Sequence, residues 1–185
     1  DVLKSLQYLP GVISGNEGTN NISVRGSDQW GNLVLLDEAM VYNPNHALSF
    51  FSVFNNDAIQ QVNLYKSYFP LMYGGRTSSV IDVRMREGNN QEKHRSATIG
   101  VIASKLQLEG PIKRGKTSYL LSTRFAYPGA ILGVLERFRG TKMNFYDINA
   151  KINSTLNDRN RFFFSIYNGG DHTYFNQLVR GYGMN

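Results

Sequence analysis

Three segments in the second half of the chain alternate between apolar and polar residues over about ten positions, as membrane-barrel strands do. They span 117–127, 147–156 and 161–169. A period of two is that of a β-strand, and about 9–11 residues suffice to cross a bilayer as a tilted strand. The apolar face of the first segment consists of Tyr119, Leu121, Phe125 and Tyr127. A transmembrane wall and a half-buried soluble sheet both fit this alternation.

The connections between these segments favour the membrane wall. Short turns at 110–116 and 157–160 alternate with long connections at 128–145 and from 170 onward. Short turns on one side of the membrane and long loops on the other are typical of outer-membrane barrels. The 11 Tyr and 11 Phe residues also suit aromatic girdles better than a helical bundle.

The order of the turns predicts an additional hairpin. If the short turns lie on the inner side of the membrane, the strand before Gly110 runs from the outer to the inner side. If the preceding domain is also connected on the inner side, one more strand, running outward, must come before it. We therefore expect 96–109 to contain a tight hairpin near Gly100, with one long strand as the alternative. About five strands then result. An open edge in lipid leaves backbone groups unpaired, so we expect the remaining strands in further sequence or in partner chains.

The first half of the chain predicts a small α+β domain. Two short alternating runs at 62–65 and 80–83 flank an irregular connection rich in Pro and Gly. A short helix at 1–9 and strands at 22–24 and 33–36 precede them. Strand directions alternate, so the polar loops 14–21 and 38–53 should share one end of the domain, with the turn 27–32 at the other. We expect this domain at 1–88, a polar linker at 89–95, and barrel strands at 96–185.

Several short motifs of the first half resemble the plug domain of TonB-dependent outer-membrane receptors. In chain order they are Leu9-Pro10-Gly11-Val12, Val24-Arg25-Gly26, the run 33–37, Asp57-Ala58-Ile59, and Tyr73-Gly74-Gly75 followed by Val80-Ile81-Asp82-Val83. The resemblance implies an α+β plug followed by antiparallel transmembrane strands. The chain would then be an incomplete fragment of a plugged β-barrel of about 22 strands. It begins within a motif and without a signal peptide, as expected for a piece of a longer protein.

The resemblance also implies functional residues. The two long loops would be the outward apices that touch the ligand, through Asn16, Glu17, Asn20, Tyr42, Asn43, Asn45 and His46. Ion pairs between plug and barrel would involve Arg25, Arg76, Arg84, Arg86 and Glu87. Turn chemistry at 43–45 and solvated charges at strand edges are the simpler interpretations of these two sets.

Composition argues against several other functions. The formal charge is +6, but the basic residues are scattered singly apart from 113–116, so we expect no nucleic-acid binding. Cysteine is absent and the three histidines lie far apart, so we expect no metal site. No arrangement of nucleophile and base and no phosphate-binding loop occurs, so we expect no catalysis and no cofactor.

The resemblance therefore implies a receptor of the bacterial outer membrane that imports a ligand. Its partners would be a TonB-type energy-coupling complex of the inner membrane and outer-membrane lipid. The alternative is a plugged-barrel structural subunit of a multi-protein assembly or secretion complex, with a surface lipoprotein or other outer-membrane subunits as partners. A soluble β-rich binding module is a third possibility. Iron chelates, cobalamin, glycans and peptides all remain open as substrates.

Overall fold

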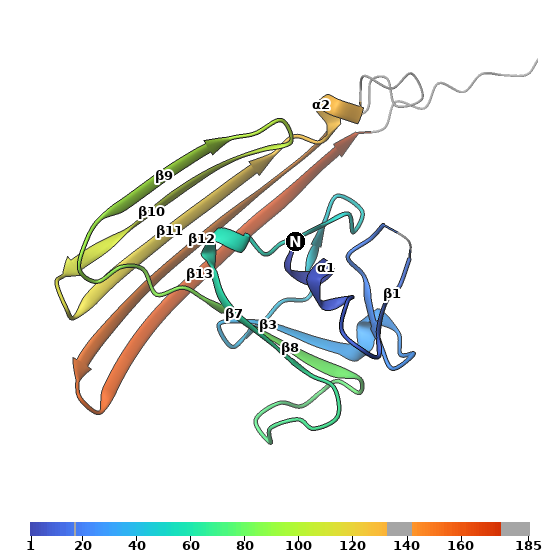
Figure 1. The fold of residues 1–185 in the computed structure, drawn as a ribbon, viewed down its shortest axis with the longest axis horizontal. Coiled ribbons are helices and arrows are strands. Elements are labelled where there is room, and N and C mark those ends of the chain that lie inside the picture. Colours follow the sequence, from blue (N-terminus) through green and yellow to red (C-terminus); the bar gives the residue numbers. More distant parts are fainter. Residues whose placement is uncertain (17, 133–141, 175–185) are drawn as a thin grey trace, which may run out of the picture.

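The computed structural model describes residues 1–16, 18–132 and 142–174. It has two parts, an N-terminal α+β domain and a sheet of five long antiparallel strands that lies along one side of it (Figure 1). None of the helices in the described part of the chain has the length and hydrophobicity of a membrane-spanning helix.

The N-terminal domain is built on a four-stranded mixed sheet in the order β4-β3-β8-β7. Strands β3 and β8 run parallel, and the other neighbours run antiparallel. The elements of this domain are α1 (Val2–Leu6), β1 (Val12–Ser14), β2 (Ile22–Val24), the 3-10 turn η1 (Gln29–Gly31), β3 (Asn32–Leu36), β4 (Ala39–Met40), β5 (Asn45–His46), β6 (Phe51–Ser52), the 3-10 turn η2 (Asn56–Ala58), β7 (Ile59–Tyr65) and β8 (Ser79–Met85). The expected strands at 22–24, 33–36, 62–65 and 80–83 are all present. The helix is shorter than expected and ends at Leu6.

Asp1 connects helix α1 to the two long loops of this domain. The Asp1 carboxylate caps α1 by accepting a hydrogen bond of 3.0 Å from the Leu3 backbone amide. It also accepts from the Ser52 amide at 2.8 Å and from the Asn20 side-chain amide at 3.1 Å. The Asn20 backbone amide in turn donates to the Ser49 carbonyl at 2.6 Å. The loops 14–21 and 38–53 therefore lie side by side, as the strand directions predict.

The five-stranded sheet has the order β13-β12-β11-β10-β9, so each strand pairs with the next along the chain. Its elements are β9 (His94–Ile99), β10 (Ala103–Lys113), β11 (Thr117–Ala126), the short helix α2 (Gly129–Leu132), β12 (Lys142–Asn157) and β13 (Asn160–Tyr174). The expected hairpin is confirmed, because β9 and β10 turn tightly around Gly100. Strand β9 starts at His94, two residues earlier than expected.

The two faces of the sheet differ in the way that the alternation predicts. On β12 the residues Phe145, Asp147, Asn149, Lys151 and Asn153 point toward the N-terminal domain and are buried. Their neighbours Tyr146, Ile148 and Ile152 point away and are exposed. The apolar face is thus uncovered and the polar face is covered. A soluble sandwich would have the reverse arrangement, with Ile152 and its neighbours in its own core.

The hydrophobic core belongs mainly to the N-terminal domain. Leu3, Val24, Phe54 and Val83 are its centre, and Leu120 of β11 reaches into it from the sheet. A smaller apolar cluster joins Ala47 of the β5–β6 hairpin to Ala126, Met143 and Phe145 of the sheet. Most of the remaining contact between the two parts is polar.

Candidate functional site

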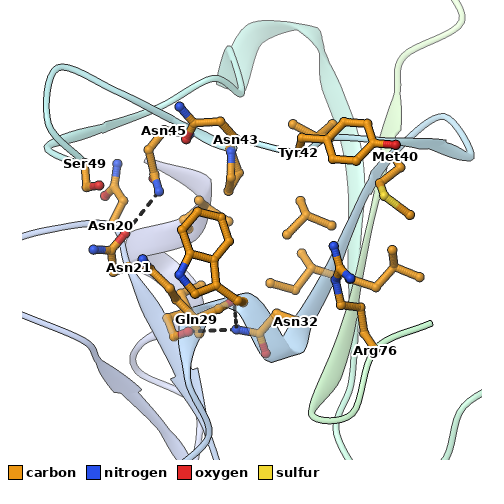
Figure 2. A pocket seen from close by; sticks show the side chains of 18 residues that line it. Asn20, Asn21, Gln29, Asn32, Met40, Tyr42, Asn43, Asn45, Ser49 and Arg76 are labelled. Carbon is orange, nitrogen blue, oxygen red and sulfur yellow. Dashed lines mark hydrogen bonds between the residues drawn. The ribbon is translucent and has the colours of Figure 1, made fainter. Parts of the chain in front are cut away.

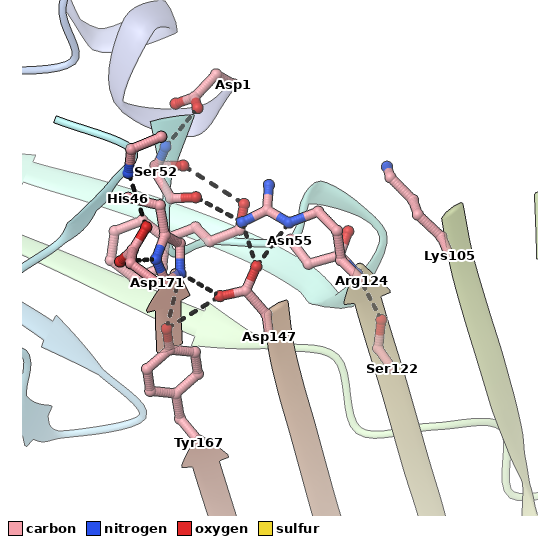
Figure 3. Close-up of polar contacts among 12 residues, drawn as sticks. Asp1, His46, Ser52, Asn55, Lys105, Ser122, Arg124, Asp147, Tyr167 and Asp171 are labelled. Atoms are coloured by element: carbon pink, nitrogen blue, oxygen red, sulfur yellow. Dashed lines mark hydrogen bonds and ion pairs between the residues drawn. The ribbon is translucent and has the colours of Figure 1, made fainter. Parts of the chain in front are cut away.

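A buried histidine joins the two parts of the molecule. His46 in β5 is only 4% exposed, and each of its ring nitrogens lies 2.7 Å from a carboxylate oxygen, one of Asp147 in β12 and one of Asp171 in β13 (Figure 3). Its ring stacks on Phe145 with centroids 4.7 Å apart. The other oxygen of Asp171 accepts from the Ala47 amide at 2.8 Å, so the hairpin β5–β6 is held by backbone and side chain together.

Asp147 is the shared partner at the centre of this arrangement. It is 0% exposed and accepts from Arg124 Nε at 2.6 Å and from the Tyr167 hydroxyl at 3.0 Å, besides its contact with His46. Arg124 Nη2 also donates to the Ser52 carbonyl at 2.6 Å. We call His46, Arg124, Asp147, Tyr167 and Asp171 the His46 cluster. A buried carboxylate is tolerated at such a place because it is paired and fully hydrogen-bonded.

The cluster favours protonated His46. Burial lowers the pKa of His46, but the hydrogen bonds and negative charges of Asp147 and Asp171 outweigh burial, so the pKa is raised above its usual value. Only the imidazolium can donate from both ring nitrogens, and both face carboxylates. In that form two cations, His46 and Arg124, balance two carboxylates.

The contact between the two parts should therefore depend on pH. Because the pKa of His46 is higher in the folded than in the unfolded protein, its contribution is complete below about pH 6.5 and is lost as the pH rises through the folded-state pKa. We expect the N-terminal domain of the full-length protein to become more sensitive to protease as the pH rises from about 6 to about 9. His46→Gln should remove most of this dependence, and an unchanged profile would contradict the assignment.

A second buried ion pair joins the same two parts of the molecule. Lys151 Nζ of β12 lies 2.9 Å from Asp37 Oδ2, which follows β3, and donates to the Met85 carbonyl at 3.2 Å. Both side chains are buried. Asn55 near η2 adds a neutral contact by donating to Ser122 Oγ at 2.8 Å.

Removing one partner of the buried pair should cost more than removing both. Lys151→Met leaves Asp37 as an unpaired buried charge, for which we expect about 3–5 kcal/mol of destabilisation. The double variant Lys151→Met/Asp37→Asn should recover much of that loss. Chemical unfolding of the full-length protein in detergent gives both values. Equal losses for the single and double variants would mean that the pair does not act as a unit.

The predicted ion-pair residues divide into three groups. Arg86 pairs with Glu109 of β10 at 2.9 Å and Glu87 pairs with Arg161 of β13, so these two contact the sheet. Arg84 pairs within the N-terminal domain instead, with Glu38 at 2.9 Å and Asp82 at 3.1 Å. Arg25 donates to Ser67, also within the domain. Arg76 has no ion pair among the described residues and lines a groove.

Most of the predicted ligand-contact residues line that groove. It is a cavity of about 310 Å³ between the loop that follows β4 and the turn before β3 (Figure 2). Asn20, Tyr42, Asn43 and Asn45 line it together with Trp30 and Arg76. We call it the plug-loop groove, defined by these six residues.

Two predicted contacts, Asn16 and His46, lie outside this groove. Asn16 lines a separate, more open pocket beside β1 and β2. Glu17 lies outside the described residues. His46 is enclosed by barrel carboxylates, so the structure places it in the contact between the two parts. In the described part of the chain, no three His, Asp or Glu residues are arranged to hold a metal ion.

Comparison with known proteins matches both parts. Residues 1–80 match the family model of the TonB-dependent receptor plug domain. The solved siderophore receptor PirA of Acinetobacter baumannii has a similar fold, with a TM-score of 0.67 and 14% identity over 95% of this chain. Two mutants of the ferric enterobactin receptor PfeA of Pseudomonas aeruginosa give TM-scores of 0.61 and 0.64 over 94% of this chain, at 14% and 13% identity. The chain spans 30% of the length of each of these receptors. A search of curated protein sequences gave no match.

Proposed function

Residues 1–80 match the plug domain of TonB-dependent receptors, and from this match we propose that the protein is an outer-membrane importer of that family. Its ligand binds at the outer loops of the plug. The plug then rearranges, and the ligand passes through the barrel into the periplasm. The energy comes from a TonB-type complex of the inner membrane, and lipid surrounds the barrel.

The observation that carries this proposal is the nature of the plug–barrel contact. A filled barrel conducts nothing until the filling moves, so the plug must be able to separate from the wall. Hydrogen bonds and ion pairs such as Asn55–Ser122 and Lys151–Asp37 can be exchanged for water. A continuous apolar contact has no such substitute. Here the main apolar contacts are those of Leu120 and Tyr167 with the core of the N-terminal domain, and the small cluster at Ala47. The interface is suited to reversible separation.

Growth of the native bacterium tests the proposal. Cells with the intact gene, without it, or with only its energy-coupling segment removed are compared on a panel of sole carbon and iron sources. We expect both deletions to cause the same defect on at least one source. Normal growth without the coupling segment, where the complete deletion fails, would contradict import. Such growth together with a stoichiometric partner on purification would favour a structural subunit instead.

A further inference from the structure

Two short turns of the plug have a left-handed backbone. They contain five of the six non-glycine residues with a positive φ in the described part of the chain. The first turn is 37–38, with φ values of 46° and 74°, and the second is 47–49, with values of 50°, 57° and 73°. A residue with a Cβ enters this region at a cost, and normally only one at a time. Both turns are therefore strained segments of the backbone.

The residue types in these turns do not suit a left-handed backbone. The 37–38 turn joins β3 to β4, and a two-residue turn with positive φ at both positions usually has glycine at the second. Glu38 occupies that position. In the 47–49 turn an alanine, a leucine and a serine are found where glycine would be expected. Leu48 is 64% exposed, so packing of its side chain does not explain the conformation.

The two buried ion pairs between the plug and the barrel wall start at these turns. Asp37 lies in the first turn, and its carboxylate is 2.9 Å from Lys151 Nζ of β12. His46 directly precedes the second turn and pairs with Asp171 of β13 at 2.7 Å, and the Ala47 amide donates to the same carboxylate at 2.8 Å (Figure 3). Strained backbone persists only where its surroundings hold it. Here those surroundings include the wall.

Contacts within the plug also reach both turns, but they are weaker or fewer. Glu38 pairs with Arg84 at 2.9 Å, and the two side chains are 63% and 29% exposed, so this pair contributes little. The Ser49 carbonyl accepts from the Asn20 amide at 2.6 Å. The contacts with the wall are buried and charged, and contacts of that kind are the stronger ones.

We propose that contact with the wall holds both turns in a left-handed conformation that relaxes when the plug leaves the wall, an inference that rests on the plug movement of the proposed function. Separation removes the strain, so the strain lowers the net stability of the contact. The buried ion pairs keep the plug in place at rest, and the strained turns reduce the work needed to separate it.

Glycine substitution tests the proposal, because glycine adopts a positive φ without a steric cost. In purified full-length protein that carries Ser122→Cys, a residue buried beneath the plug, the rate of labelling by a thiol reagent measures how often the plug uncovers the wall. Leu48→Gly is compared with Leu48→Ala, and Glu38→Gly with Glu38→Ala. Each pair removes the same side-chain contacts, so the difference reports the backbone. Glycine should slow labelling about fivefold relative to alanine in both pairs.

Phe50 supplies the matched control, because it follows the second turn and has no positive φ. Phe50→Gly should label no more slowly than Phe50→Ala, since glycine there only adds freedom to the separated state. Equal labelling within either test pair would overturn the proposal, because that turn would then stay left-handed after separation. Slower labelling of Phe50→Gly as well would also overturn it, since glycine would then act without relieving strain.

The outcomes are independent of the growth experiment. Labelling of the purified protein uses neither a ligand nor an energised membrane, so equal labelling within the test pairs leaves the import function standing. Normal growth without the coupling segment, together with slower labelling of both glycine variants, refutes import and keeps the strained turns.

Discussion

If the protein imports its ligand as proposed, joining the plug to the barrel wall by a covalent bond is expected to abolish that import. Asn55 and Ser122 are hydrogen-bonded across the contact at 2.8 Å, and both are buried. Residues 1–185 contain no cysteine, so the double variant Asn55→Cys/Ser122→Cys introduces the only thiols of this part of the protein. Oxidation, or a short thiol-specific cross-linker, then fixes the plug to β11. If the plug must move away from this wall, growth on the imported source should fall to that of the deletion strain.

Reduction provides the internal control for this experiment. A reductant should restore growth in the oxidised double variant, while each single cysteine variant should grow normally under both conditions. A cysteine pair within the plug, Ile13→Cys/Ser23→Cys, joins two directly paired neighbours of β1 and β2 and leaves the wall free. Normal import by the cross-linked Asn55/Ser122 variant would mean that this side of the plug stays in place during transport.

Neutralising Asp147 is expected to cause one of the two largest losses of stability of any single substitution in the contact, comparable to that of Lys151→Met. Asp147→Asn keeps the shape of the side chain but leaves Arg124 and protonated His46 with one remaining carboxylate, that of Asp171. Breaking a buried charge network in this way costs about 3–5 kcal/mol. The plug of the full-length protein should become sensitive to protease, and unfolding in detergent should occur at lower denaturant concentration.

A turn residue supplies the comparison for Asp147. Asp158 lies exposed between β12 and β13, and no ion pair involves it among the described residues. Asp158→Asn removes the same charge from the same hairpin and should leave stability within about 0.5 kcal/mol of the parent protein. Equal effects of the two substitutions would show that the His46 cluster contributes nothing specific.

Local sequence patterns were sufficient to predict the five-stranded sheet and which residues lie on each of its two faces. A two-residue period places Leu121 and Ile152 on one face and Arg124 and Asp147 on the other, whatever surrounds the strand. The hairpin at Gly100 followed from strand direction together with the resemblance, because a plug that leaves on the inner side must be followed by an outward-running strand before the inward-running strand that ends near Gly110. Arg86 and Glu87 lie next to the point where the plug chain leaves for the barrel, so their contact with the sheet is also a local consequence.

The contacts of the plug with the wall needed information that local patterns lack. His46 and Asp147 are 101 positions apart, and His46 and Asp171 are 125 apart. The loop location of His46 suggested a ligand contact, whereas its partners came from strands that pack against it only in the folded protein. The alternation of apolar and polar residues along β12 contained one further indication of this contact. Charged residues such as Asp147 and Lys151 on an inward face must meet partners, which identifies them as contact residues before the partners are known.

The most direct test of the account is the exposure of Ser122 during import. This residue lies under Asn55 and is buried in the resting contact. A membrane-impermeant thiol reagent is applied to cells that carry the single variant Ser122→Cys in the full-length protein, with and without an energised inner membrane and the imported source. We predict little labelling at rest and strong labelling during import. Equal labelling in both states would contradict the claim that the plug separates from this wall.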